Sequence, residues 1–402
     1  MENTGPHAEL ILLGVLVCVI VYSLLTKVVS RSVLTLPIIF MVIGFAASPS
    51  LTTFAPPEVL FQSSRFLAEI TLILILFADA SHVRFAKLKN AFQFPLRMLV
   101  IGMPLTIAFG TATVYVISPE GGLAMALLTA AVLTPTDAAL GQNVVSSPDV
   151  PLRLSQTINI ESGLNDGLAL PFVLLGAILA SAGMEPAQTG GLAVNTLMQI
   201  VLGPIVGAAI GWSVARALDL ARNRDWINES AQAVVFLTTA FATYLLAELV
   251  GGNGFIAAFV GGAVFGNVFR HGIHFITEFM ESQGQLLSMA AFLIFGAVLL
   301  PEGLAHMTPT ALMIAVLFLT VVRIVPILLS LIGSGLTMSE KLFLGWFGPR
   351  GIASILFTLI MIDEFEFSNK DELLACVSMT VFLSILLHGV TATPLAKRIG
   401  RL

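Results

Sequence analysis

Two short segments carry most of the polar side chains that could do chemistry in an otherwise apolar chain. One is the sequence ESGLNDG at 161–167, and the other is TPTD at 134–137. Carboxylate, hydroxyl and amide oxygens are the atoms that hard cations prefer as ligands. Oxygen groups of this kind inside apolar segments predict a site that binds a small cation, a proton or both.

Spacing divides the polar side chains of the first segment between two faces of a helix. Ser162 and Asp166 are four residues apart and share one face. Glu161 and Asn165 share the next face. We assign Asp166 and Ser162 to the ion. Glu161 then faces a neighbouring helix, and we expect it to form a buried salt bridge with Arg323, whose own apolar run contains no acid.

Other charges inside apolar runs are candidates for function or for ion pairs, because a charge at the centre of a bilayer costs about 3 kcal/mol. Glu69 has two possible partners, Arg65 one turn away and Arg350 in a distant segment, and the sequence leaves both open. Arg350 could instead compensate the carbonyl end of an interrupted helix. Asp137 could both bind a ligand and cap a half-helix, since aspartate is a good N-cap.

The composition places these groups in a membrane. Of the 402 residues, 57% are hydrophobic and 11% are charged, whereas a soluble domain has about 25% charged residues. The net charge of -5 gives no reason to expect a nucleic-acid partner. Spanning helices need about 20 mainly apolar residues, and thirteen runs approach this length: 8–27, 33–48, 59–79, 91–117, 121–144, 153–180, 190–217, 229–249, 252–268, 284–300, 308–333, 340–362 and 372–396.

Most of the 19 basic residues fall in alternate loops, for example at 216–224 and 397–401. Because cytoplasmic loops are rich in lysine and arginine, we expect the N-terminus outside and the C-terminus in the cytoplasm of an inner (cell) membrane. Opposite sides require an odd number of helices. The last apolar run ends near Leu402, so no soluble regulatory domain is expected.

Helix breakers occur beside a charge in two of the runs, at Pro135 next to Asp137 and at Pro349 next to Arg350. Proline removes a backbone donor, so both helices should be discontinuous. Each break falls on the fifth helix of its half if 1–180 and 226–402 are six-helix repeats joined by a linker helix in 181–225. An odd linker inverts the second repeat, and paired broken helices in inverted repeats mark the binding site of a secondary transporter.

The segments TPTDAAL, ESGLNDG, VVRIVP (321–326) and GPRG (348–351) together resemble those of the monovalent cation/proton antiporters. The similarity is greatest to the sodium/proton exchanger branch with an Asn-Asp pair, the NhaP/NHE type. It implies an all-α membrane protein of thirteen helices, in which helices 4–6 and 11–13 form a mobile core. Discontinuous helices 5 and 12 would cross in that core, and the remaining helices would form a scaffold that dimerises.

The resemblance also implies roles for individual residues. Asp166 corresponds to the carboxylate that binds both ion and proton, and Asp137 to the acid of the broken-helix motif. The further ligands would be Ser162 and the backbone near Thr136, which makes Asp166, Asp137 and Ser162 the side-chain ligands of a monovalent cation. Asn165 stands where the electrogenic branch has a second aspartate. Glu161 resembles the partner of Arg323, and Glu69 that of Arg350.

These assignments predict alternating access in which Na+ or K+, and Li+ as a further candidate, competes with H+ for Asp166. Exchange would be electroneutral, one cation for one proton, with no cofactor and no enzymatic activity. The alternative is an intramembrane aspartyl protease that uses Asp137 and Asp166, although neither Gly-x-Gly-Asp nor Pro-Ala-Leu occurs. A symporter of related fold is a third interpretation. Membrane lipid and a second copy of the chain are the expected partners.

Overall fold

The described part of the chain is helical, with no strand in it. A computed structural model describes residues 5–29, 34–54, 57–83, 93–137, 140–141, 144, 147–182, 189–271, 274–367 and 369–401. The elements are α1 (Gly5–Val29), α2 (Leu36–Phe54), α3 (Pro57–His82), α5 (Gln93–Arg97), η2 (Met98–Gly102), α6 (Met103–Ile117), η3 (Pro119–Gly121), α7 (Gly122–Leu133), α9 (Leu152–Ala182), α10 (Thr189–Asn223), α11 (Glu229–Leu249), α12 (Gly254–Val268), α13 (His274–Ile294), η5 (Phe295–Leu299), α14 (Leu300–Ala305), α15 (Pro309–Leu319), α16 (Val321–Ser330), α17 (Met338–Trp346), α18 (Ile352–Glu364) and α19 (Lys370–Ile399).

Each of the thirteen predicted apolar runs overlaps one or more of these helices. Eight helices in the described residues are long and apolar enough to cross a membrane, and shorter apolar helices include α7 and α12. The prediction of an all-α, membrane-spanning protein is therefore confirmed. Part of the run 121–144, after Asp137, lies outside the described residues.

Both predicted breaks are present. α7 ends at Leu133 and is followed by the non-helical residues 134–137. α17 ends at Trp346, and α18 begins at Ile352. A further interruption was not predicted: α15 and α16 are separated at Thr320, whose backbone has φ -120° and ψ -96°.

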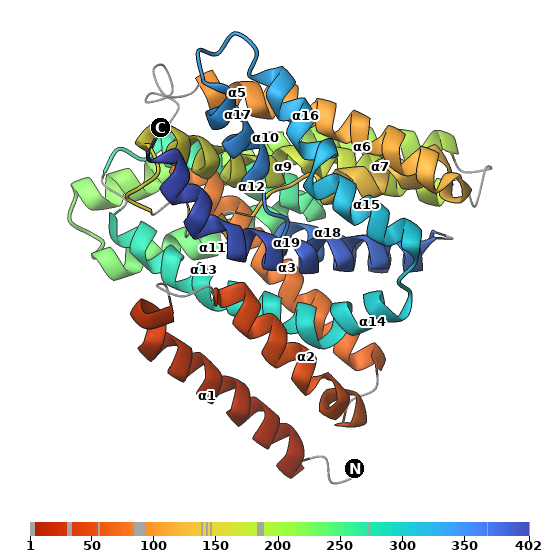
Figure 1. Ribbon diagram of the computed structural model, residues 1–402. Coiled ribbons are helices and arrows are strands. Elements are labelled where there is room, and N and C mark those ends of the chain that lie inside the picture. Colours follow the sequence, from red (N-terminus) through yellow and green to blue (C-terminus); the bar gives the residue numbers. More distant parts are fainter. Residues whose placement is uncertain are drawn as a thin grey trace.

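Figure 1 shows how the helices surround these breaks. α1 lies at the edge of the bundle beyond α2, while α6 and α7 lie on the opposite side. α18 and α19 run between these layers, and α9 packs along α7. The residues at the two breaks, among them Thr136, Asp137 and Arg350, are buried within the bundle.

Glycines allow α12 to pack very closely on α3, as the Gly261, Gly262 and Gly266 pattern predicts. A Cβ atom on Gly262 would lie 2.1 Å from the Phe77 carbonyl oxygen. One on Gly266 would lie 2.0 Å from the carbonyl oxygen of Ser81. The close approach of α12 holds α3 in place, and α3 carries an acid of the site described next.

Candidate ion-binding site

The two broken helices meet and supply each other's missing hydrogen-bond partners. The Asp137 carboxylate accepts the N–H of Ile352, the first residue of α18, over 2.8 Å. Its own N–H donates to the Pro349 carbonyl over 2.8 Å. In return, Arg350 Nη1 donates to the carbonyls of Thr134 and Pro135, where α7 has ended. An anion at a helix N-terminus and a cation at a helix C-terminus both interact favourably with the helix dipole.

Two glycines of the GPRG segment make this contact possible. A Cβ atom on Gly351 would lie 2.0 Å from Asp137 Oδ2. One on Gly348 would lie 2.4 Å from Arg323 Nε. No Cβ atom occupies such distances, so glycine at these positions lets Asp137 and Arg323 reach the second break.

A buried salt bridge lies beside the break. Arg323 Nη1 and Nη2 donate to the two carboxylate oxygens of Glu161 over 2.8 and 3.1 Å. These side chains are only 2% and 1% exposed, so nearly the whole pair is out of contact with solvent. The pairing is the one expected from the sequence.

Thr136 connects this salt bridge to the polar face of α9. Its hydroxyl donates to Glu161 Oε2 over 3.1 Å and lies 3.1 Å from Ser162 Oγ. The Asn165 amide donates to Thr136 Oγ1 and, over 3.4 Å, to Glu161 Oε1. Asn165 and Thr136 thus join α9 to the first break.

Asp166 differs from these neighbours because one of its carboxylate oxygens has no hydrogen-bond partner among the described residues. That atom is Oδ1, and the residue is 8% exposed. No basic side chain in the described part of the chain forms an ion pair with it. A buried carboxylate that lacks a partner requires a proton or a cation to offset its lost hydration.

Asp79 of α3 is a third acid at this site, and the sequence analysis missed it. Its position near the end of a predicted span suggests contact with water, but α3 continues to His82 and Asp79 is only partly exposed. The Asp79 carboxylate is near enough to Asp137 and Asp166 for their charges to interact. Asp79 also lies close to α9, because a Cβ atom built on Gly163 would be 3.7 Å from the Cβ atom of Asp79. Its place at the end of a predicted span, rather than beyond it, was the available signal.

The acids do not form a compact metal centre. Among the described residues, no three His, Cys, Asp or Glu side chains are grouped closely enough to hold a metal ion. Asp166, Asp137 and Asp79 instead come from separate elements and create a region of negative charge. Such a region suits a transported ion that arrives and leaves.

Nearly the whole chain, residues 11–398, matches the family model described as sodium/hydrogen exchanger, transmembrane. The matched range includes every residue of this site. The chain belongs to the sodium/hydrogen exchanger family. Its fold resembles that of the sodium proton antiporter MjNhaP1 from Methanocaldococcus jannaschii, with a TM-score of 0.78 at 18% identity, covering 98% of this chain and 99% of that one.

Relatives in the exchanger family include transporters of both Na+ and K+. The Na(+)/H(+) antiporter NhaH of Halobacillus dabanensis is 27% identical, and the alignment covers 97% of both chains. The K(+)/H(+) antiporter NhaP of Alkalimonas amylolytica is 24% identical over 97% of this chain and 67% of that protein. NhaP2 of Shewanella sp. (strain ANA-3) is 23% identical over 93% and 64%. The chain therefore spans about two thirds of the length of NhaP and NhaP2.

Membership of a transporter family leaves the intramembrane protease interpretation without support. The geometry agrees with this, because one carboxylate oxygen of Asp137 is engaged by the α18 backbone. A protease dyad would need both acids directed at a peptide bond.

The prediction that Glu69 pairs with Arg65 or with Arg350 is wrong. Glu69 Oε1 accepts the hydroxyl of Tyr244 over 2.8 Å. Arg65 contacts Asp363 and lies 4.0 Å from Glu364 at the end of α18. Arg350 is occupied by the carbonyls of α7, which is the role of compensating a half-helix that the sequence had offered as an alternative.

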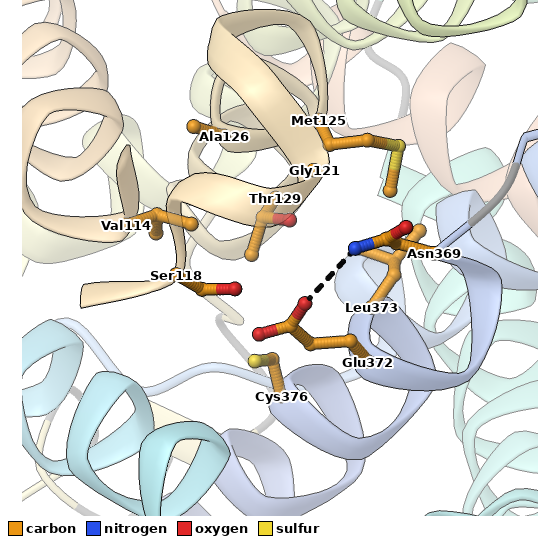
Figure 2. A pocket seen from close by; sticks show the side chains of 10 residues that line it. All are labelled: Val114, Ser118, Gly121, Met125, Ala126, Thr129, Asn369, Glu372, Leu373 and Cys376. Carbon is orange, nitrogen blue, oxygen red and sulfur yellow. Dashed lines mark hydrogen bonds between the residues drawn. The ribbon is translucent and has the colours of Figure 1, made fainter. Parts of the chain in front are cut away.

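A cavity lies between α6, α7 and α19 (Figure 2), and Asp79, Asp137 and Asp166 are not among its lining residues. It has about 260 Å³ of space between atoms, counted together with its opening to solvent. Residues from the first turns of α7 line this cavity, whereas the ion site lies beyond the other end of α7. The lining residues are Val114, Ser118, Gly121, Met125, Ala126, Thr129, Asn369, Glu372, Leu373 and Cys376.

Proposed function

We propose that this protein exchanges a monovalent cation, Na+ or K+, for H+ across the membrane. The observation that carries the proposal is the buried Asp166 carboxylate, one oxygen of which has no hydrogen-bond partner within the described ranges and lies beside a framework of hydrogen bonds. Either a proton or a cation relieves the cost of that charge, and the two compete for it. Competition at one carboxylate is sufficient for exchange, because the two loaded forms are close to neutral and the empty charged form is costly to move.

Ligands for the cation come from the elements that meet at the breaks. Asp166 supplies the carboxylate that alternates between proton and ion. Asp137 contributes a second negative charge that stays in place because the α18 N-terminus holds it. Ser162 and the backbone near Thr136 offer neutral oxygen atoms. Asp79 adds negative charge from α3.

Movement of a core against a scaffold would expose the site to each side in turn. The core would contain helices 4–6 and 11–13, which correspond to α5 through α9 and α15 through α19. Residues 1–180 and 226–402 would be inverted repeats joined by 181–225. The chain would lie in the cell membrane with its N-terminus outside and its C-terminus in the cytoplasm.

A homodimer formed through the scaffold is part of the proposal, with lipid covering the remaining apolar surface. α1 lies at the edge of the bundle and exposes Leu16, Ile20 and Leu24 by 50%, 58% and 80%. This face is too apolar for water, so a second copy or lipid tails must cover it.

Proteoliposomes that contain the purified protein and a pH-sensitive dye test the function. Na+, K+ and Li+ are added separately, and proton movement is compared between the wild type and Asp166→Asn. We expect at least one cation to drive proton movement opposite to its own, and the variant to be inactive although folded. Proton movement in the same direction as the cation, or equal rates in Asp166→Asn, would contradict the proposal.

A further inference from the structure

The break between α17 and α18 leaves backbone groups without helical partners on both sides, and α19 supplies partners to both. At the end of α17, the Trp346 carbonyl lies 2.9 Å from His388 Nε2. Before α18, the Arg350 N–H donates to Ser384 Oγ over 2.7 Å. Ser384 Oγ and His388 Nδ1 lie 3.2 Å apart, one turn along α19. Ser384 and His388 therefore bridge the break, and we refer to them as the α19 bridge.

The donors and acceptors of the α19 bridge fix its direction. A carbonyl only accepts, so a proton on His388 Nε2 would be donated to Trp346, whose carbonyl also accepts the Gly348 N–H over 2.8 Å. Ser384 Oγ accepts from the Arg350 N–H, which leaves its own proton for His388 Nδ1. Nδ1 also lies 3.0 Å from the Ser384 carbonyl, an acceptor that only a doubly protonated ring would satisfy. Such a ring would be a further cation buried within the bundle, and the Ser384 hydroxyl can donate to an unprotonated Nδ1, so we assign the neutral Nε2–H form.

Burial and ring packing hold the bridge in one arrangement. Ser384 is fully buried, and His388 is 1% exposed. The Trp346 ring packs on the His388 ring at 5.3 Å between centroids, and its Nε1 donates to Thr391 Oγ1 of α19 over 3.0 Å. The last residue of α17 is thus fixed to α19 by its carbonyl and by its side chain.

The bridge leads directly to the ion site. Arg350, whose N–H is held by Ser384, caps the end of α7 with its guanidinium group. The preceding residue, Pro349, accepts the N–H of Asp137. Any change in the gap between α17 and α18 would therefore move Arg350 and Asp137 together.

We propose that Ser384 and His388 are positioning residues for ion exchange. They set the separation of the two half-helices and, through Arg350, the place of Asp137, without binding the ion or carrying the transported proton. The inference rests on the proposed exchange function, and its test must separate the failure of one from the failure of the other.

Substitutions at His388 separate positioning from proton carriage. The amide nitrogen of glutamine lies as many bonds from Cα as His388 Nε2 does, so His388→Gln can still donate to the Trp346 carbonyl. His388→Leu has a similar volume and no donor. We expect His388→Leu to raise the apparent KM for the cation by about tenfold, with a smaller change in maximal rate. His388→Gln should restore most of the affinity and keep the wild-type pH profile.

Ser384→Ala provides a second test that removes only a hydroxyl group. It should raise the apparent KM in the same way, and combining it with His388→Leu should add little, because the two residues act as one unit. The matched control is His306→Gln, since His306 is an exposed histidine at the end of α14. This control should leave both kinetic constants unchanged.

Nitrogen NMR of histidine-labelled protein tests the bridge without transport, with His388→Gln identifying the signal. We expect the neutral Nε2–H tautomer, and a shifted Nδ1 signal in Ser384→Ala. A wild type that shows this tautomer but no cation-driven proton movement would overturn the exchange proposal alone. A wild type that exchanges would overturn the inference if His388→Leu keeps the wild-type KM, if His388→Gln has as high a KM as His388→Leu, or if His388 carries its proton on Nδ1.

Discussion

Asp137 and Arg350 each stabilise the helix that the other one interrupts. Asp137 follows the end of α7 and accepts an N–H from the start of α18, while Arg350 precedes α18 and donates to the carbonyls at the end of α7. The charges of both residues therefore compensate unpaired backbone groups within the bundle. An ion at Asp166 would meet Asp137 and Arg350 already held by these contacts, so these two side chains need little reorganisation when it binds.

Gly351→Ala tests the contact between Asp137 and α18. The added methyl group would lie 2.0 Å from Asp137 Oδ2, so the carboxylate must move away from the Ile352 N–H. We expect a loss of exchange of at least about tenfold, as for an interaction worth 1.4 kcal/mol. Cation-driven proton movement and thermal unfolding in detergent would be measured together.

The matched control for this substitution is Gly14→Ala in α1. A methyl group there meets nothing within 4 Å, and alanine favours helix over glycine by about 1 kcal/mol. This variant should exchange ions normally and be at least as stable as the wild type. If Gly351→Ala behaved like Gly14→Ala, Asp137 would not need its place at the start of α18.

Glu161→Ala and Arg323→Ala should each lower stability by about 3–5 kcal/mol, because removing one member leaves the other as an unpaired buried charge. The double variant should be more stable than the sum of the two losses predicts. Thermal unfolding of all four proteins measures this coupling. Strictly additive losses would show that the two side chains do not stabilise each other.

Local chemistry in the sequence was sufficient to predict both breaks and the Glu161–Arg323 pair. Proline alone was not the signal, since Pro171, Pro204 and Pro394 lie inside continuous helices. The informative feature was a proline near a charged residue, because a charged side chain can form hydrogen bonds with the backbone groups that the break leaves unpaired. The interruption at Thr320 has no such feature and was missed.

Glu161 and Arg323 are 162 residues apart and could still be paired, because the run that contains Arg323 has no acid of its own. Other partners that are distant in the sequence carry no such signal. Asp137 and Ile352 are 215 residues apart, and Glu69 and Tyr244 are 175 apart. A sequence shows that a buried acid needs a donor, but many donors satisfy that need. Which one does so depends on helix packing, and the donor to Glu69 is the uncharged hydroxyl of Tyr244, not an arginine.

Asp79→Asn tests whether the acid on α3 contributes to cation binding. Its charge acts on Asp137 and Asp166, so neutralising it should weaken attraction for a cation. We expect the apparent KM for the driving cation to rise by about three- to tenfold, within 1.4 kcal/mol, while exchange persists. Asp225→Asn, at an exposed loop position with φ 55°, is the control because asparagine tolerates that conformation. Equal affinities in both variants and the wild type would remove Asp79 from the site.

Charge balance is the most direct consequence of having Asn165 next to Asp166. The Asn165 amide donates to Thr136 and Glu161, so it is a fixed neutral group and cannot carry a second proton. We expect Asp137 to stay ionised, because its carboxylate accepts the N–H at the α18 N-terminus, which favours an anion. If Asp166 alone alternates between H+ and the cation, both loaded states carry the same charge, and exchange is one for one and electroneutral.

Liposomes with equal ion and proton concentrations on both sides decide this point. An imposed membrane potential should then produce no net proton movement in the wild type, whereas a cation gradient should drive it. Protein-free liposomes and Asp166→Asn measure the leak. An electroneutral cycle moves no net charge, so a membrane potential cannot drive it. The contrary result is proton movement that follows the potential, requires the cation and disappears in Asp166→Asn. It would mean that a second group is protonated during the cycle, with Asp137 or Asp79 as the candidate.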